Sequence, residues 1–409
     1  MTSKVKRTLK IIGLLAAIVA VYVGAAAWYI WKWEKPHLPL PAAHLEHSDK
    51  QVYVENHVDL ADAANHAMVK LARQLETVSL SGALALDGDL VWAGSIGLAD
   101  VEQQIPASIE SRYRIGSVSK SLTAIALARM VELGLIGLDD QVQSHLPDYP
   151  RFGAPMTVRQ LAGHLSGIRH YEMNLLEFPP HDFYLDTHFD DVISATEVFK
   201  TDNLKFTPGQ GFHYSTYGYT LLSAVMQQAA GMPFLDLMQT LVFDPLDMNA
   251  TAAEQPGSVD NLVEFYNSDN GEYGITRDVD LSIKWAGGGL VSTPSDLVTL
   301  GAALLNDRLI QPATRQAFFA TQPMFDGSEN PQAYALGWRH HETINILGED
   351  QPVDVVHHGG TSVGGVAFLL LVPDHNISIA FLSNGAGGET RREIQMLAYR
   401  IAAMAIAQK

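Results

Sequence analysis

A serine and a lysine lie three positions apart at Ser117 and Lys120, directly before an apolar run from Leu122 to Leu133 that stops at Gly134. The run predicts a helix, because it is rich in Ala, Leu and Ile and because glycine commonly follows a helix C-terminus. Residues three apart share a helix face, so we expect Lys120 one turn above Ser117. Unpaired N–H groups at a helix start stabilise negative charge, and a desolvated lysine loses its proton more easily. The spacing therefore suits a serine nucleophile that is activated by a lysine base.

The Ser-x-x-Lys pattern is weak evidence by itself, since it occurs again at Ser3 and Lys6 within a basic leader. Two other segments carry groups that could act with it. Tyr214 is a candidate general acid or base if cationic neighbours lower its pKa; the alternative is a core tyrosine. The segment from His357 to Gly360 lies between two strand-like runs, where glycines let a substrate backbone approach closely. Its alternative is a glycine-rich turn with solvated histidines.

Together these segments resemble the serine β-lactamase and penicillin-binding-protein superfamily, in the branch that includes class C β-lactamases and D-aminopeptidases. The family carries three motifs in order: Ser-x-x-Lys, Tyr-x-Asn, and Lys-Thr-Gly or His-x-Gly. In this sequence they are filled by Ser117 and Lys120, by Tyr214-Ser215-Thr216, and by His358-Gly359-Gly360. Thr216 replaces the asparagine of the family, so the amide that would hydrogen-bond the substrate is missing. Gly364 lies where the family repeats a glycine, which favours His358 over His357.

The resemblance implies a role for each matched residue. The catalytic residues would be Ser117 as the acylated nucleophile, Lys120 as its base, and Tyr214 as the relay that protonates the leaving group. His358 would replace the lysine that binds a substrate carboxylate, so we expect that binding to weaken as pH rises through the histidine pKa. The oxyanion hole would be formed by the backbone N–H groups of Ser117 and of Thr361, which follows Gly360.

Further segments extend the resemblance from about residue 70 to the end of the chain. They look most like the mitochondrial serine β-lactamase-like proteins, which form filaments. These segments are His164 to Tyr171, Trp285 to Gly289 with Ser292-Thr293, and Tyr334 to Trp338.

Three other patterns suggest different chemistry. Residues 360–364 spell the Gly-x-Ser-x-Gly elbow of α/β-hydrolases, but that motif needs a helix after Ser362, and a β-rich run follows. Ser268-Asp269-Asn270 spells a motif of class A β-lactamases, yet the glycine after it favours a hairpin turn. The acidic stretch from His181 to Asp191 contains histidines without metal-ligand spacing, so we expect no metal there.

The elements that must position these residues follow from periodicity. Residues 60–75 have helical spacing, and 390–407 form an amphipathic pattern. Strand signals occur in two groups, one near each end of the chain: 81–86, 90–95, 353–356, 366–372 and 377–382. Asp87-Gly88-Asp89 joins the first two as a hairpin. We therefore predict an α/β fold with an antiparallel sheet built from both chain ends, flanked by N- and C-terminal helices. A mainly helical insert at about 150–280 would include a candidate lid at 178–191.

Composition restricts the chemistry further. The chain has 409 residues and no cysteine, which excludes disulfides, thiolate metal sites and a cysteine nucleophile. Residues 1–33 hold five cationic side chains and no acid: Lys4, Lys6, Arg7, Lys10 and Lys32. The formal net charge is −18, so residues 34–409 carry −18 − 5 = −23. Such an acidic remainder argues against a nucleic-acid partner.

The N-terminal segment predicts a membrane anchor. The run from Ile11 to Ile30 is uncharged and about 30 Å long as a helix, with cations before it and tryptophans near its end. The positive-inside rule places the N-terminus in the cytoplasm and the rest of the chain on the exported side. A cleaved signal peptide is the alternative, because Ala25-Ala26-Ala27 offers a peptidase site. We divide the chain into an anchor (1–34), a tether (35–59) and a β-lactamase-like domain (60–409).

We interpret the chain as a membrane-anchored serine hydrolase whose catalytic domain lies on the exported, periplasmic side. It would act through an acyl-enzyme on amide, peptide or ester bonds of a small-molecule or peptide substrate, without a cofactor or metal. One alternative is a carboxylesterase on the same scaffold, and another is a filament or scaffold protein whose active site is incidental. Assembly into a homo-oligomer is left open.

Overall fold

The computed structural model describes residues 3–33, 37–150, 154–173, 181–255, 257, 259–269, 271–328, 330–387 and 389–409. Its centre is an antiparallel sheet with the strand order β11-β12-β13-β14-β3-β4-β2, and β5 pairs with β4. The strands are β2 Ser48–Val52, β3 Ser79–Leu86, β4 Asp89–Asp100, β5 Ile105–Pro106, β11 Arg339–Thr343, β12 Val353–Ser362, β13 Gly365–Val372 and β14 Ile377–Ser383. The predicted α/β fold with an antiparallel sheet and flanking helices is confirmed.

The two ends of the chain meet at the centre of this sheet. Strand β14 pairs with β3 from Leu382 opposite Ser81 to Ile377 opposite Leu86. The hairpin between β3 and β4 turns at Asp87 and Gly88, whose φ angles are +54° and +99°. Two consecutive residues with positive φ form the turn that matches the right-handed twist of the strands. The hairpin is as predicted, except that Asp89 belongs to the second strand rather than to the turn.

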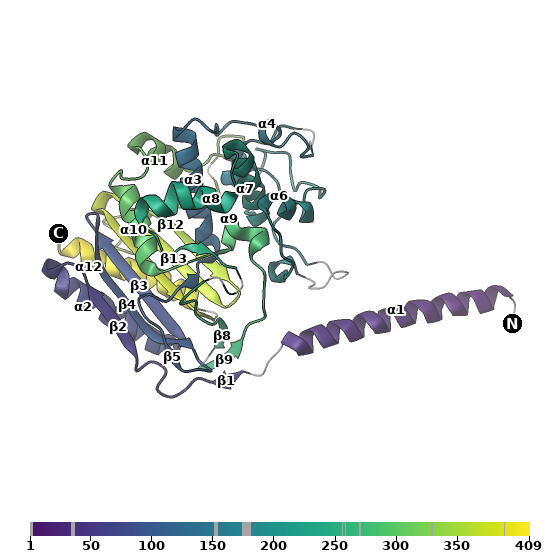
Figure 1. Ribbon diagram of the computed structural model, residues 1–409, viewed down its shortest axis with the longest axis horizontal. Helices are drawn as coiled ribbons and strands as arrows, with labels where there is room; N and C mark the ends of the chain where they lie inside the picture. Colours follow the sequence, from purple (N-terminus) through teal and green to yellow (C-terminus); the bar gives the residue numbers. More distant parts are fainter. Residues whose placement is uncertain are drawn as a thin grey trace.

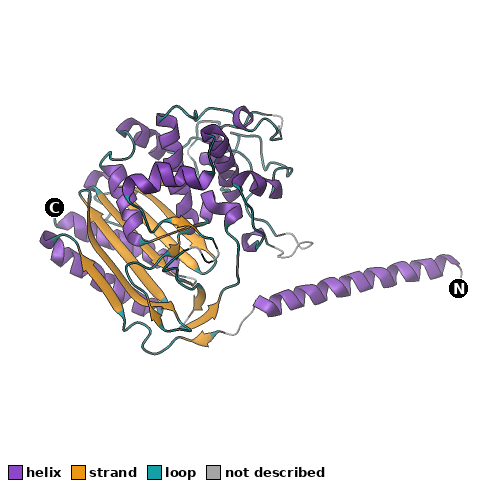
Figure 2. Ribbon diagram, in the orientation of Figure 1, coloured by secondary structure: helices purple, strands orange, loops and turns teal. Residues whose placement is uncertain are grey.

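Helices cover both faces of the sheet (Figures 1 and 2). On one face, α2 (Val58–Leu75) packs on β3 and β4, and α12 (Thr390–Ala407) packs on β13 and β14. On the other face, α10 (Pro294–Leu305) packs on β14 and β3, and α3 (Ser119–Glu132) joins the same hydrophobic core. The uninterrupted apolar strand β13 is buried along its whole length because both of its faces are covered.

Mainly helical elements lie between the two groups of strands in the sequence, and Figure 1 shows those in teal gathered at one end of the sheet. They are α4 Val142–His145, α5 Val158–Ala162, α6 Val192–Ala195, α7 Thr216–Ala230 and α8 Phe234–Met238, with the short helices η3 Asp182–Tyr184, η4 Thr196–Val198, η5 Gln239–Phe243 and η6 Asp244–Leu246. After them come η7 Ser282–Lys284, α9 Trp285–Gly288 and α11 Pro312–Phe319. The beginning of the candidate lid, 178–180, lies outside the described residues.

Short strands complete the described fold. One small sheet contains β6 Tyr113–Arg114, β7 Ala252–Ala253 and β10 Leu290–Ser292, and another contains β1 Leu38–Pro39, β8 Tyr266–Asp269, β9 Glu272–Ile275 and β15 Gly385–Ala386. Strands β8 and β9 form an antiparallel hairpin, and Gly271 has a φ of +76°. The predicted hairpin is present, but Ser268 and Asp269 belong to its first strand rather than to its turn; Asn270 lies outside the described residues.

The N-terminal helix α1 (Ser3–Trp33) extends away from the remainder of the chain (Figure 1). Its segment from Val5 to Trp28 has a mean hydropathy of 2.3 and is long and apolar enough to cross a membrane. A signal sequence would satisfy the same criterion, so the predicted anchor and its orientation stay predictions.

Candidate active site

Ser117 lies at the junction between a short strand and the helix that the sequence predicted. The chain leaves β6, turns through Gly116 (φ +49°) and enters the short helix η2 (Gly116–Val118), which continues into α3. Lys120 follows in the first turn of α3, and its Nζ lies 3.2 Å from Ser117 Oγ. Gly134, with a φ of +69°, lies just beyond the end of α3. The structure thus brings Ser117 and Lys120 together as the helical spacing requires.

The amine of Lys120 is fully buried and has three hydrogen-bond acceptors around it. Besides Ser117 Oγ, these are Thr216 Oγ1 at 3.0 Å and the carbonyl oxygen of Gly287 at 2.5 Å. Burial lowers the pKa of Lys120 well below its usual value, and the nearby cations Arg339 and Lys284 lower it further. A neutral amine 3.2 Å from Ser117 Oγ can accept the serine proton.

Tyr214 reaches Ser117 from a different part of the chain. Its side chain hydrogen-bonds with that of Ser117, and Lys120 Nζ lies 4.9 Å from the centre of its ring. Burial raises the pKa of Tyr214 to about 12, although the bond to Ser117 and the cations Arg339 and Arg391 lower it in part. Tyr214 is therefore a phenol at neutral pH, which suits a group that donates a proton to a leaving atom.

The third motif lies on β12, whose alternation separates the two histidines. His358 faces the pocket that Ser117 lines, whereas His357 packs on the opposite face of the strand against His341 and Phe368, with ring centroids 5.1 and 5.3 Å away. The strand geometry therefore favours His358 over His357 as the pocket residue, in agreement with the glycine spacing.

The surroundings of His358 differ from what its expected role requires. Its Nδ1 lies 2.8 Å from the carbonyl oxygen of Gly359 and must donate, so Nε2 accepts from the hydroxyl of Tyr334 at 3.1 Å. Burial lowers the pKa of His358 well below its ordinary value, and Arg339 and Lys120 add to this effect. His358 is consequently neutral, and the pH-dependent charge that the sequence suggested for binding a carboxylate does not arise there.

Two arginines that sequence analysis did not select supply positive charge instead. Arg339, at the start of β11, and Arg391, near the start of α12, both line the pocket. Arg339 donates to Gln332 Oε1 at 2.5 Å, and its guanidinium carbon lies 5.8 Å from the centre of the Tyr214 ring. The only sequence signal for Arg339 is its position directly after the Tyr334–Trp338 segment; nothing in the sequence marked Arg391.

The backbone segments that would form the oxyanion hole pack tightly together. A Cβ atom on Gly360 would lie 2.0 Å from the carbonyl oxygen of Ile115 and 3.2 Å from the nitrogen of Ser117. A Cβ atom on Gly116 would lie 2.7 Å from the nitrogen of Thr361. Glycine at these positions lets β12 approach the start of η2. Ser117 and Thr361, which both line the pocket, are thereby brought close together.

The pocket has a volume of about 350 Å³ and contains most of the residues that the sequence selected. It is lined by Ser117, His170, Tyr171, Phe183, Tyr214, Thr216, Lys284, Gly287, Gly288, Gln332, Arg339, His358, Gly359, Thr361, Ser362 and Arg391. Lys120 lies beneath this surface through its bonds to Ser117 and Thr216, and Gly360 lies behind it against Ile115. His170, Lys284 and the two arginines were missed because their approach depends on tertiary packing.

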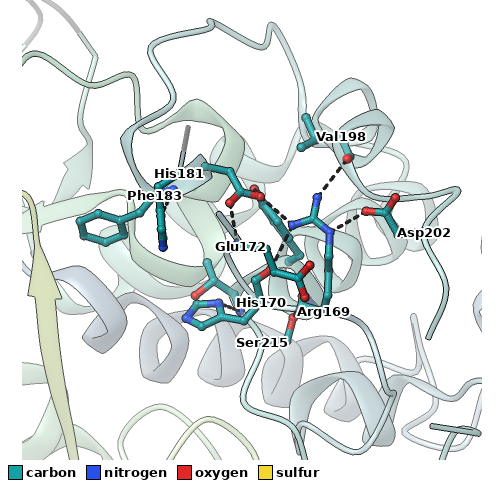
Figure 3. A network of polar contacts seen from close by, with 12 residues as sticks. Arg169, His170, Glu172, His181, Phe183, Val198, Asp202 and Ser215 are labelled. Carbon is teal, nitrogen blue, oxygen red and sulfur yellow. Dashed lines mark hydrogen bonds and ion pairs between the residues drawn. The ribbon is translucent and has the colours of Figure 1, made fainter. Parts of the chain in front are cut away.

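A network of ion pairs and hydrogen bonds around Arg169 lies beside the Tyr-Ser-Thr motif (Figure 3). Arg169 donates from Nε to Asp202 at 2.5 Å and from a terminal nitrogen to Asp182 at 2.6 Å. The carbonyl oxygen of Arg169 accepts from Ser215 Oγ at 2.6 Å, which connects the network to the Tyr-Ser-Thr motif. Lys284 Nζ donates to the carbonyl oxygen of Phe183 at 2.9 Å. Ion pairs and hydrogen bonds thus connect described residues of the candidate lid, Asp182 and Phe183, to the residues around the motif.

Ser362, the serine of the alternative hydrolase elbow, lies at the end of β12, and the next element is strand β13. The helix that an elbow requires is therefore replaced by a strand, as the sequence favoured.

A Ser-x-x-Lys pair at a helix start, a tyrosine hydrogen-bonded to the serine and a glycine-containing strand of an antiparallel sheet define a class of serine hydrolases. A family model described as Beta-lactamase matches residues 64–403, and the chain belongs to the β-lactamase family. It is 31% identical over 372 residues to the mitochondrial serine beta-lactamase-like protein LACTB of Homo sapiens, with 71% of this chain and 68% of that protein covered.

One further relative is similar in sequence, and one solved structure shares the fold. Penicillin-binding protein 4* of Bacillus subtilis (strain 168) is 27% identical over 312 residues, with 73% of this chain and 66% of that protein covered. The crystal structure of D-amino acid amidase from Ochrobactrum anthropi SV3 superposes with a TM-score of 0.69 at 22% identity, with 86% of this chain and 99% of that chain covered. The chain is a β-lactamase-related serine hydrolase.

Proposed function

We propose that the chain cleaves its amide or ester substrate through a covalent acyl-enzyme on Ser117. The observation that carries this proposal is the environment of Lys120, a buried amine that lies 3.2 Å from the serine hydroxyl and whose pKa burial lowers well below its ordinary value. Such an amine is a base at neutral pH, whereas an ordinary lysine is an ammonium ion there.

In the acylation step, Lys120 takes the proton of Ser117 while Oγ attacks the substrate carbonyl carbon. The carbonyl oxygen becomes an oxyanion that accepts hydrogen bonds from the N–H groups of Ser117 and Thr361, an interaction worth several kcal/mol in acyl transfer. The intermediate collapses when the phenol of Tyr214 gives its proton to the leaving nitrogen or oxygen. The ammonium of Lys120 then reprotonates Tyr214. Water releases the acyl group as a carboxylic acid, and the serine regains its proton.

We also propose that Arg339 and Arg391 bind an acidic group of the substrate, in place of His358. Both arginines line the pocket and remain charged at any physiological pH, whereas His358 is buried and neutral. An arginine binds a carboxylate through two parallel hydrogen bonds, which a single histidine cannot do.

The membrane anchor belongs to the same proposal. Helix α1 would hold the domain on the exported side of the membrane, since cationic residues precede its apolar segment. Protease added to intact spheroplasts would then digest the domain while residues 1–10 stay protected. A mature protein that begins near Trp28 and washes off the membrane would contradict the anchor and favour a signal peptide.

Turnover tests the proposed function directly. We expect the purified chain to hydrolyse activated esters and to show a burst of product release equal to one equivalent of enzyme when deacylation is slow. Ser117→Ala should abolish both the burst and turnover. A wild-type chain without turnover of esters, D-amino-acid amides, peptides or a chromogenic cephalosporin would contradict the proposal. Rescue of a deletion strain by Ser117→Ala would favour the scaffold or filament alternative.

A further inference from the structure

The hydroxyl of Thr216 is engaged by two neighbouring side chains of the protein. Its Oγ1 accepts from Lys120 Nζ at 3.0 Å, and its side chain also hydrogen-bonds with the partly buried Tyr171. A threonine hydroxyl is a single O–H donor with two acceptor sites, unlike asparagine, whose amide carries two N–H donors beside its oxygen. The substitution therefore keeps the contact with the lysine and removes the donor that would face the pocket.

A different donor lies beside this position. The backbone N–H of Thr216 donates to His170 Nδ1 at 3.2 Å, so Nδ1 is unprotonated and the ring carries its proton on Nε2. Burial, with a contribution from the charge of Lys120, lowers the pKa of His170 to about 3, which keeps the ring neutral. Within the described part of the chain, Nε2 has no hydrogen-bond partner, and the ring lines the pocket next to Tyr214, with centroids 5.7 Å apart.

His164 makes the same backbone contact without reaching the pocket. Its Nδ1 accepts the N–H of Ser215 at 3.2 Å, one residue before Thr216. The ring is 1% exposed, packs 4.3 Å from the Tyr214 ring, and is absent from the pocket lining. Two histidines thus accept from consecutive backbone N–H groups, but His164 Nε2 is buried without a partner among the described residues, whereas the His170 ring lines the pocket.

We infer that the Nε2–H group of His170 binds a carbonyl oxygen on the acyl side of the substrate and replaces the amide that Thr216 lacks. The substrate class is then an acyl group with an amide carbonyl beyond the scissile carbonyl, as in N-acylaminoacyl esters or amides and in peptides. Because the donor is a neutral imidazole, it selects a neutral acceptor and keeps this preference across the physiological pH range. His170 is a specificity-determining residue in this scheme, which rests on the proposed acyl-enzyme function.

Two esters of p-nitrophenol with acyl chains of equal length test the inference. One carries N-acetylglycine and the other carries pentanoic acid, which has the same chain length but no amide. For each ester we compare kcat/KM of the variant with that of the wild type. His170→Phe keeps an aromatic ring but lacks Nε2–H, and it should lower kcat/KM for the acetylglycyl ester about 5- to 10-fold more than for the pentanoyl ester.

The control variants separate this contact from structural effects. His164→Phe removes the equivalent acceptor of a backbone N–H and should lower kcat/KM for both esters by the same factor. His170→Gln, whose amide can accept from Thr216 and still donate, should retain most of the preference. Adding Thr216→Asn to the His170→Phe variant should restore the preference for the acetylglycyl ester. If His170→Phe fails to fold, a change in the substrate tests the same contact in the wild type. Replacing the acetyl oxygen of the acetylglycyl ester by sulfur, a weaker acceptor, should lower kcat/KM of the wild type several-fold. The same replacement should lower kcat/KM of His170→Gln by a similar factor.

The outcomes distinguish the two proposals. The role of His170 would be overturned if His170→Phe lowered kcat/KM for both esters by the same factor. It would also be overturned if the preference for the amide-containing ester disappeared in Lys284→Met instead. Both results would leave the acyl-enzyme proposal intact. The role of His170 would likewise be overturned if the wild type hydrolysed the sulfur-substituted ester and the oxygen-containing ester with equal kcat/KM. Failure of the wild type to hydrolyse either ester would count against the proposed function itself.

Discussion

Lys120 Nζ lies 3.0 Å from Thr216 Oγ1, and this contact connects the first motif of the site to the second. The sequence indicated that threonine loses the family amide, yet the structure shows that the hydroxyl still receives a hydrogen bond from the lysine. Lys120 is thereby held between α3 and α7, with the carbonyl oxygen of Gly287 as a third acceptor. An amine fixed in this way cannot turn from Ser117 without leaving buried acceptors unsatisfied.

Removing the amine should slow acylation strongly. We expect Lys120→Ala to lower the acylation rate at least about 100-fold, the usual scale for loss of a general base. Lys120→Arg should be equally inactive, because a guanidinium keeps its proton. Single-turnover kinetics with an activated ester would measure the rate. Wild-type acylation should increase as pH rises through the depressed pKa of Lys120 and then level off. An unchanged rate in Lys120→Ala would mean that another group deprotonates Ser117.

Two adjacent glycines on β12 provide a matched test of the backbone contact behind the oxyanion hole. Gly360→Ala would put Cβ 2.0 Å from the carbonyl oxygen of Ile115, whereas Gly359→Ala would meet no atom closer than 3.7 Å. We expect Gly360→Ala to destabilise the protein by about 1 to 3 kcal/mol and to lower kcat, since β12 must move away from η2. Gly359→Ala should fold with nearly wild-type stability. Denaturant titrations compare the two, and equal stability of both variants would contradict the packing.

The source of positive charge in the pocket can be identified from pH profiles. We expect KM for a carboxylate-bearing ester to stay nearly constant between about pH 6 and 8, because guanidinium groups do not titrate there and His358 is already neutral. Arg391→Gln and Arg339→Gln should each raise this KM several-fold while leaving KM for a neutral ester unchanged. The assignment would be lost if KM rose across that range in the wild type and His358→Lys removed the rise.

Lys284 should make stability depend on pH in a defined direction. Burial, together with the charge of Arg114, lowers its pKa to about 7, against 10.5 in an unfolded chain. Between these values the unfolded chain holds a proton that the native protein lacks, so the free energy of unfolding rises with pH. Relative to Lys284→Met, the free energy of unfolding of the wild type should increase by up to about 2.7 kcal/mol between about pH 7.5 and 9.5. This is the largest change that a difference of one bound proton can cause over that pH range. A constant difference across this range would show that Lys284 is protonated in the folded protein.

Local patterns were sufficient to predict much of the fold and the core of the site. The hairpin at Asp87-Gly88 and the helix of Ser117 and Lys120 depend on residues close in sequence, and α12 begins and ends where its periodicity indicated. Strand β12 is longer than predicted and reaches Ser362. Its glycines weaken the local strand signal, but Gly359 and Gly360 both pair with residues of β13, which compensates for this.

The ionisation of the site could not be predicted in the same way. The neutral state of His358 depends on Tyr334, Gly359 and burial, and the approach of Arg339 and Arg391 depends on how β11 and α12 pack beside β12. The tautomer of His170 is set by a backbone N–H that lies 46 positions further along the chain. Such effects arise from tertiary packing, for which a single sequence carries no periodic signal.

A fluorophosphonate adduct mapped by mass spectrometry tests the central claim most directly, because the reagent bonds only to an activated serine. Ser117 and Ser362 both line the pocket, and Ser362 Oγ is buried without a hydrogen-bond partner among the described residues. Our account predicts one adduct per chain, on the peptide that contains Ser117, and no labelling of Ser117→Ala. An adduct on Ser362 in the wild type, or undiminished labelling of Ser117→Ala, would contradict it.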